Sequence, residues 1–351
     1  MIKQLALKII LKIIQQKDVQ QAINQIQTEL PLHYPSAETI GYSGKLLNDY
    51  IDLAQPMSIT DNVDENAPIF ISARFRSGST FLWNIFRQLD SLHCYYEPLN
   101  ERKWFDEVGR GNTTDDSHQG VNDYWKEYQQ FDSSNIQFET DWTFKRLWLD
   151  QHSHEPALKN YIESLIEQAP ARPVLQFNRV DFRLPWLKKH FPKAKIVHLY
   201  RHPRDQWISV TRNSIEVPLN YNGHDLSRYN LFYTAEWADN LSYRFPFLKI
   251  SQGKHPYYYH YLLWRLSNML GHKHADICIG FESLCHQFDS IIPSVFESLG
   301  ITGYDLKTLS ALRAQQNGGK WKQYADNNWF TEIESECEFI LNVFFDLSSQ
   351  R

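Results

Sequence analysis

Residues 67–82 read APIFISARFRSGSTFL and combine a short apolar run, a loop and the start of a helical pattern. The apolar run is typical of a buried strand. In the segment that follows the loop, Phe81, Ile85 and Leu89 fall on one face of a helix. A loop that joins a strand to a helix in this way directs backbone N–H groups and the positive end of the helix at one point. The stretch therefore predicts a site for a phosphate or sulfate.

The residue types within the loop support the same interpretation. Gly78 allows the backbone to come close to a ligand, and Arg76 supplies positive charge. Hydroxyl donors come from Ser77, Ser79 and Thr80. A nucleoside triphosphatase or kinase would have G-x-x-x-x-G-K-[ST] here, and the missing second glycine and lysine disfavour that class. A plain structural turn stays the alternative for the loop alone.

Three further apolar runs predict buried strands, and helix-compatible sequence follows each of them. They are PVLQFNRV (173–180), AKIVHLYR (194–201) and ADICIGF (275–281). Strands that alternate with helices favour a parallel sheet with helices on both faces, a three-layer αβα fold. We expect one such domain over residues 67–351, with a helical N-terminal extension over residues 1–66. Ligands of such sheets bind beyond the carboxyl ends of the strands.

Charge, cysteine content and histidine spacing argue against nucleic-acid binding, a disulfide framework and a zinc site. The formal charge of −5 gives no overall attraction to nucleic acid, so an anion must be bound by a local group of basic residues. The four cysteines are scattered and fit a reduced cytoplasmic protein. The close pairs His152/His154 and His272/His274 lack the further ligands of a zinc site, so no metal is expected.

A second motif, KIVHLYRHPRDQWISVTRN, begins in the strand predicted over 194–201. Arg201 leaves the sheet at its carboxyl edge, Pro203 suits an opening helical turn, and Ser209 can face the same phosphate as Arg201.

Together the two motifs resemble the sulfotransferases that use 3′-phosphoadenosine 5′-phosphosulfate (PAPS). Their 5′-phosphosulfate loop reads [KR]-[ST]-G-[ST]-[ST], and residues 76–80 match it position by position. Their 3′-phosphate element is an Arg at a strand end, then [NH]-P-[KR]-D, with a Ser eight residues after the Arg. The resemblance implies that Arg201 and Ser209 bind the 3′-phosphate of PAPS or of its product PAP, that Phe81 stacks on adenine, and that Arg74 belongs to the cofactor-binding loop.

Two weaker matches lie downstream. ADICIGFESL is similar to a late strand of the family, in which Glu282 would be structural. NGGKWKQY resembles the family's closing G-x-W-[KR] segment near the 3′-phosphate. The Arg-Lys-Gly sequence of the cytosolic branch is missing upstream of it, and Gly318, Gly319 and Lys320 can substitute, beside Trp321.

The resemblance also implies catalytic residues. Arg76 would stabilise the departing phosphate without a metal. The cytosolic branch uses a histidine as base on the strand that here carries Asn178 and Arg179, and no histidine is present. The carbohydrate and tyrosyl-protein branches use a glutamate in a [YF]-E-P context, which makes Glu97 of CYYEPLNE the expected general base. A surface or helix-capping glutamate is the alternative, and His93 and Glu101 are the other candidates.

Arginine at the head of the loop and Glu97 together favour a carbohydrate or glycolipid acceptor. The tryptophans crowded between Trp104 and Trp148 fit either core packing or a sugar-stacking cleft. The alternatives for the whole chain are a P-loop kinase or hydrolase and a non-catalytic binder of PAP or a sulfated glycan. Residues 1–17 place Ile2, Leu5, Ile9 and Ile13 at helical spacing, and this amphipathic helix fits docking on its own domain or a peripheral membrane contact.

Overall fold

The computed structural model describes residues 34–42, 64–114, 121–211, 217–222, 225, 226, 229, 231–250, 253–313 and 318–348. The amphipathic N-terminal segment lies outside these residues. Within them, no helix combines the length and the apolarity needed to cross a bilayer.

A five-stranded parallel sheet forms the centre of the domain. Its strands are β1 (Ile69–Ala73), β2 (Leu92–Tyr96), β3 (Arg172–Phe177), β4 (Lys195–Tyr200) and β5 (Ile277–Gly280), in the order β2-β3-β1-β4-β5. Every described pair is parallel, and β1 lies between β3 and β4, with Ile69 opposite both Val174 and Lys195. The central position of β1 therefore places its carboxyl end next to the carboxyl end of β4. The predicted anion-binding loop, residues 74–80, begins there and is called the anion loop.

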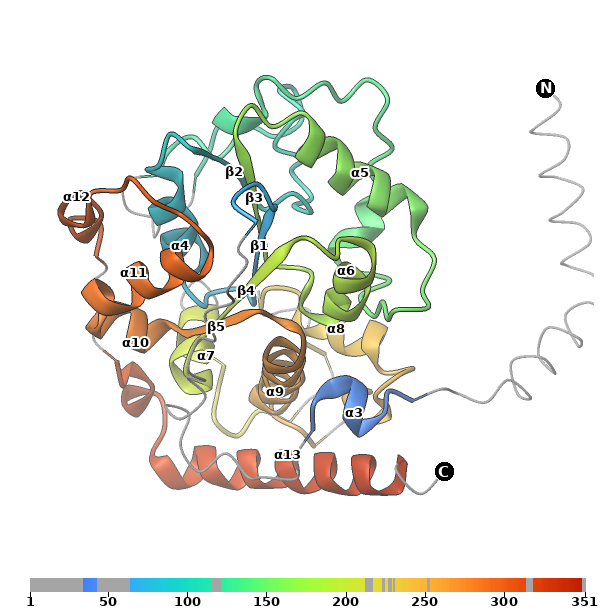
Figure 1. Cartoon of the computed structure of the whole chain (residues 1–351). Helices are drawn as coiled ribbons and strands as arrows, with labels where there is room; N and C mark the ends of the chain where they lie inside the picture. Colours follow the sequence, from blue (N-terminus) through green and yellow to red (C-terminus); the bar gives the residue numbers. More distant parts are fainter. Residues whose placement is uncertain are drawn as a thin grey trace, which may run out of the picture. The chain divides into compact units, whose positions relative to one another are not determined.

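Helices cover both faces of the sheet. Figure 1 shows α4, α10 and α11 on one side of it and α5, α6 and α9 on the other. The longer helices are α4 (Ser79–Arg87), α5 (Pro156–Glu167), α6 (Leu184–His190), α7 (Pro203–Thr211), α8 (Thr234–Leu241), α9 (Pro256–His274), α11 (Phe288–Ser298) and α13 (Asn327–Ser348). The shorter ones are α3 (Ala37–Ile40), α10 (Phe281–His286) and α12 (Leu306–Ser310), with 3₁₀ turns η1 to η5 at 126–128, 140–143, 181–183, 246–248 and 320–323. The three-layer α/β fold is as the sequence predicts.

The strand core is mostly apolar, as expected for strands covered on both faces, and it also buries the polar residues Ser72, Gln176 and His198. Ile69, Phe70 and Ile71 have no exposed surface, and the ring of Phe70 packs edge-on against Phe177 and Phe191. Outside the sheet, two buried ion pairs fix α13: Arg204 of α7 binds Glu334, and Arg265 of α9 binds Glu338.

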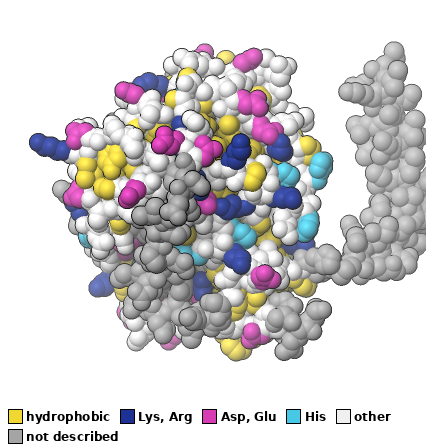
Figure 2. Space-filling model, viewed as in Figure 1, with side chains coloured by type: hydrophobic (Ala, Val, Ile, Leu, Met, Phe, Trp, Pro, Cys, Tyr) yellow, Lys and Arg dark blue, Asp and Glu magenta, His cyan; other side chains and the backbone are white. Residues whose placement is uncertain are grey.

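The first described helix, α3, packs against α9 and α13 of the domain. Ser36 caps α3, and Ile40 is completely buried in the domain core. On the face drawn in Figure 2, acidic and basic side chains of the described residues are interspersed, in keeping with the absence of an overall charge preference.

Candidate active site

The loop between β1 and α4 turns sharply at Arg74–Gly78. The amide and the hydroxyl of Ser77 both donate to the carbonyl oxygen of Arg74, at 3.3 and 2.5 Å. Arg76 and Gly78 have left-handed backbones, with φ of 63° and 92°. Gly78 is the N-cap of α4 and has no side chain to cap it, so the first-turn N–H groups are available to an anion.

Gly78 is also required by a close neighbour. A Cβ atom at this position would lie 2.3 Å from the ring of Phe281. We expect Gly78→Ala to lower the free energy of unfolding by about 2–6 kcal/mol, because left-handed strain and overpacking each cost about 1–3 kcal/mol. Urea denaturation measures the loss. Gly303→Ala is the control, since Gly303 has φ of 75° but open space around its Cβ position. Equal losses in both variants would show that the contact with Phe281 contributes nothing.

The two anion-binding motifs meet in the structure. The Nε of Arg76 donates to the hydroxyl of Ser209 at 3.1 Å, and the guanidinium of Arg201 donates to the carbonyl oxygen of Arg76 at 3.0 Å. Gln206 adds a bond to the carbonyl of Phe75 at 2.6 Å. The parallel pairing of β1 with β4 brings the motifs to one edge of the sheet. Arg76 and Arg201, 125 residues apart, therefore belong to one site.

Arg201 is held with unsatisfied donor capacity. Its guanidinium lies over the ring of Phe281, and its buried Nε has no hydrogen-bond partner among the described residues. The nearest carboxylate oxygen, on Glu282, is 4.0 Å away, and that carboxylate also accepts a bond from the amide of His202. Burial lowers the pKa of Arg201 and raises the pKa of Glu282. Because the ion pair with Glu282 is long and the Nε donates no hydrogen bond to a described residue, the partly buried guanidinium can still bind an anionic ligand.

The C-terminal motif lies against the same element. The amide of Gly319 donates to both carboxylate oxygens of Asp205, at 3.1 and 3.0 Å, and the ring of Trp321 lies under the guanidinium of Arg204. Lys320 is exposed. Residues 319–321 thus contact Asp205 and Arg204 of α7, the helix that follows Arg201 and carries Ser209.

The other predicted cofactor-binding residues near the loop, Phe81, Thr80 and Arg74, lie in different surroundings. Phe81 is partly buried beside Phe281, with ring centroids 6.2 Å apart, so it borders the Arg201 region. The hydroxyl of Thr80 is bonded to Tyr96. Arg74, in contrast, forms a buried ion pair with Asp181 at 3.0 Å and lies over Trp237. The structure therefore does not bring the Arg74 guanidinium together with Arg76.

Glu97 is buried and connected to the loop. Its carboxylate accepts bonds from Asn178, from Asn100 at 2.5 Å and from Arg179 at 3.1 Å. The carboxamide oxygen of Asn178 accepts in turn from the hydroxyl of Ser79, at 3.1 Å. This chain of bonds is called the Glu97 network. It joins the carboxyl ends of β2 and β3 to the start of α4, so hydrogen bonds connect the Glu97 carboxylate to the anion loop.

Of the other base candidates, Glu101 lies in the same region and His93 does not. Arg179 binds Glu101 at 2.6 Å as well as Glu97, and the hydroxyl of Tyr233 donates to Glu101 at 2.7 Å. His93, near the amino end of β2, bonds to the carbonyl oxygen of Glu127, and burial lowers its pKa. Sequence reasoning missed the contributions of Tyr233 and Asp181, and no motif or spacing marks either residue.

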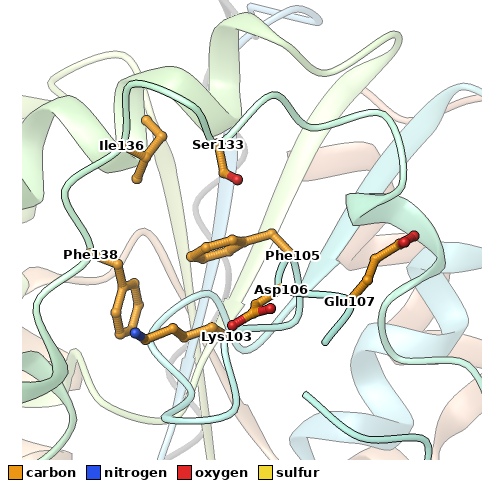
Figure 3. Close-up of a pocket in the computed structure, with 7 residues that line it drawn as sticks. All are labelled: Lys103, Phe105, Asp106, Glu107, Ser133, Ile136 and Phe138. Atoms are coloured by element: carbon orange, nitrogen blue, oxygen red, sulfur yellow. The ribbon is translucent and has the colours of Figure 1, made fainter. Parts of the chain in front are cut away.

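A separate pocket has a volume of about 400 Å³. Its lining comes from the segments that follow Glu101 in the sequence: Lys103, Phe105, Asp106, Glu107, Ser133, Ile136 and Phe138. In Figure 3 the ring of Phe105 crosses its centre and Glu107 points away from Lys103. Neither Arg76 nor Arg201 lines it. In the portion of the chain that the structure covers, no three His, Cys, Asp or Glu side chains are grouped to hold a metal.

The fold is an α/β domain in which the loop from β1 to α4, with an uncapped helix N-terminus, lies at the carboxyl edge of a parallel sheet. A model of the sulfotransferase family matches residues 68–247, just over half of the chain. The chain belongs to the sulfotransferase family, whose reaction is sulfuryl transfer. Among solved structures, it is similar to the sulfotransferase domain from the Synechococcus PCC 7002 olefin synthase, at 15% identity and a TM-score of 0.32, over 81% of this chain and 91% of that domain. No curated protein matches.

Proposed function

We propose that this chain transfers a sulfuryl group from PAPS to a hydroxyl of a carbohydrate or glycolipid. The observation that carries the proposal is the junction of Arg76, Ser209 and Arg201 at one sheet edge. PAPS carries anionic groups at both ends of its ribose, so its binding needs two basic groups on neighbouring elements. The Nε of Arg201, which has no hydrogen-bond partner among the described residues and only a 4.0 Å ion pair with Glu282, fits the need for an anionic ligand.

In this proposal, each motif holds one end of PAPS. The first-turn N–H groups of α4, with Arg76, Ser77, Ser79 and Thr80, hold the 5′-phosphosulfate. Arg201 and Ser209 hold the 3′-phosphate with support from residues 319–321, and Phe81 borders the adenine. PAPS supplies the sulfuryl group and a leaving phosphate. Arg76 donates to that phosphate as negative charge develops on it.

Glu97 would act as general base for the acceptor hydroxyl. The Glu97 network fixes the carboxylate through Asn178, Asn100 and Arg179 and ties it to Ser79 of the loop. A base held in this way keeps its position relative to the bound donor, which general base catalysis requires. The acceptor proton moves to the Glu97 carboxylate while the acceptor oxygen gains the sulfuryl group.

A thermal-shift comparison tests the donor. We expect PAP to raise the melting temperature of the full chain, while ATP with Mg²⁺ at the same concentration gives no rise, because no lysine follows Gly78 to bind terminal phosphates. At 100 times Kd, PAP adds about 2.7 kcal/mol to stability. Equal stabilisation by ATP with Mg²⁺ would favour a kinase or hydrolase instead.

A further inference from the structure

Three half-buried aromatic rings lie beside Arg76 and Glu101. We call Phe144, Phe232 and Tyr233 the aromatic platform. The rings of Phe144 and Tyr233 are nearly parallel, with centroids 6.3 Å apart and an interplanar angle of 23°. The guanidinium of Arg76 lies 5.6 Å from the ring of Phe232. The platform therefore adjoins the residue that stabilises the leaving group.

The backbone of the platform is strained. Phe232 and Tyr233 have φ of 48° and 61°, a left-handed conformation that costs bulky residues free energy. Packing of both rings against Phe75 and the bond from Tyr233 to Glu101 hold this conformation, directly before α8. Strain of this kind is retained where it fixes side chains for a function.

Glu101 supplies a carboxylate with spare acceptor capacity. One oxygen accepts from Tyr233 and the other from Arg179, and these are its hydrogen bonds to described residues. A carboxylate can accept about four. The Glu101 side chain is 38% exposed, whereas that of Glu97 is 8% exposed. Glu101 can therefore accept hydroxyl groups from outside the protein while Arg179 and Tyr233 hold it still.

We propose that Glu101 and the aromatic platform form the acceptor subsite, and that they bind a neutral sugar ring. Two hydroxyls of the sugar donate to Glu101, and its C–H face packs on the platform rings, the pairing of aromatic surface with a few fixed polar groups that is usual in ligand sites. A carboxylate accepts hydrogen bonds and repels anions, so we expect Glu101 to favour neutral sugars over uronic acids and sulfated sugars. This proposal rests on the proposed function, because it names the acceptor of the same reaction.

Saturation-transfer NMR on the PAP-loaded full chain tests the subsite. The probes are the methyl glycosides of glucose, galactose and mannose, with methyl glucuronide and p-cresol as competing classes. We expect transfer to the ring protons of at least one neutral hexoside and none to the glucuronide. Glu101→Ala should raise the Kd of that hexoside at least tenfold, since a hydrogen bond to a charged group contributes about 1.5–3 kcal/mol. Tyr233→Phe, which removes only the hydroxyl that holds Glu101, should weaken it less.

Glu107→Ala is the matched control, because Glu107 is an exposed carboxylate in the pocket of Figure 3. Hexoside binding should be unchanged in it. Binding lost in Glu107→Ala and retained in Glu101→Ala would move the subsite to that pocket and overturn the proposal. Binding of p-cresol without any hexoside would overturn the sugar class. Stabilisation by PAP, measured on the same samples, distinguishes failure of the subsite proposal from failure of the proposed function. If PAP still stabilises the chain while no hexoside binds, only the subsite proposal fails.

Discussion

In the Arg201→Ala variant, we expect PAP to give almost no rise in melting temperature. The Arg201 guanidinium is buried between the ring of Phe281 and the carbonyl of Arg76, and it has donors to spare for a phosphate. Loss of two charge-assisted bonds raises Kd by about 100-fold or more. At a PAP concentration 100 times the wild-type Kd, stabilisation then falls from about 2.7 to below about 0.5 kcal/mol.

The control for this result is Arg146→Ala. Arg146 is a partly exposed arginine that pairs with the carboxylates of Glu139 and Glu155, and it lies outside the candidate site. We expect this variant to keep the full stabilisation by PAP. If Arg201→Ala also keeps the full stabilisation by PAP, Arg201 does not bind the 3′-phosphate. The proposal that Arg76, Ser209 and Arg201 form the donor site would then be wrong.

Local sequence predicts the sheet where its strands are continuous apolar runs. The runs at 69–73, 172–177, 195–200 and 277–280 are β1, β3, β4 and β5, each within a few residues of the prediction. β2 was missed. Its sequence, LHCYY, mixes His and Tyr with apolar residues, and it lies at the edge of the sheet, where only one neighbouring strand pairs with it. Burial of its two tyrosines comes from tertiary packing that periodicity does not encode.

Side-chain direction was the harder part of the site to predict. The meeting of Arg76 with Ser209 follows from a loop and a strand end that share one sheet edge. The direction of Arg74 follows from Asp181, which is 107 residues away, so nothing near Arg74 in the sequence shows it. Asn178 bridges Ser79 and Glu97 because it directly follows β3, whereas the sequence places it inside the strand predicted over 173–180, at the position where the cytosolic branch carries a histidine.

The aromatic segment resolves in favour of the core. Trp104, Trp142 and Trp148 are 3%, 1% and 4% exposed, so these three cannot form a sugar-stacking cleft, and Trp125 is partly buried against the core. Composition cannot make this distinction, because tryptophan suits a core and a binding surface equally. The half-buried rings near Arg76 and Glu101 are those of Phe144, Phe232 and Tyr233. Phe232 and Tyr233 lie almost 90 residues after Phe144 in the sequence.

Buried glutamates in ion pairs allow a sharp test of the proposed base. Glu97 pairs with Arg179, and Glu127 pairs with Arg87 at 2.5 Å, with side chains 8% and 11% exposed. Both substitutions to Gln break a buried pair, which costs stability. Only Glu97 is connected to the anion loop. Glu127→Gln is therefore the matched control for Glu97→Gln.

We expect Glu97→Gln to bind PAP as the wild type does and to convert PAPS to PAP about 100-fold more slowly, because general base catalysis contributes about 10²–10⁴-fold. Glu127→Gln should lose stability without this loss of turnover. The measurement is single-turnover conversion of PAPS with the neutral hexosides and with water as acceptors, below the melting temperature of both variants. Equal turnover in the two variants would remove Glu97 from the role of base. Glu101, the exposed carboxylate on the same arginine, would then be the group that takes the acceptor proton.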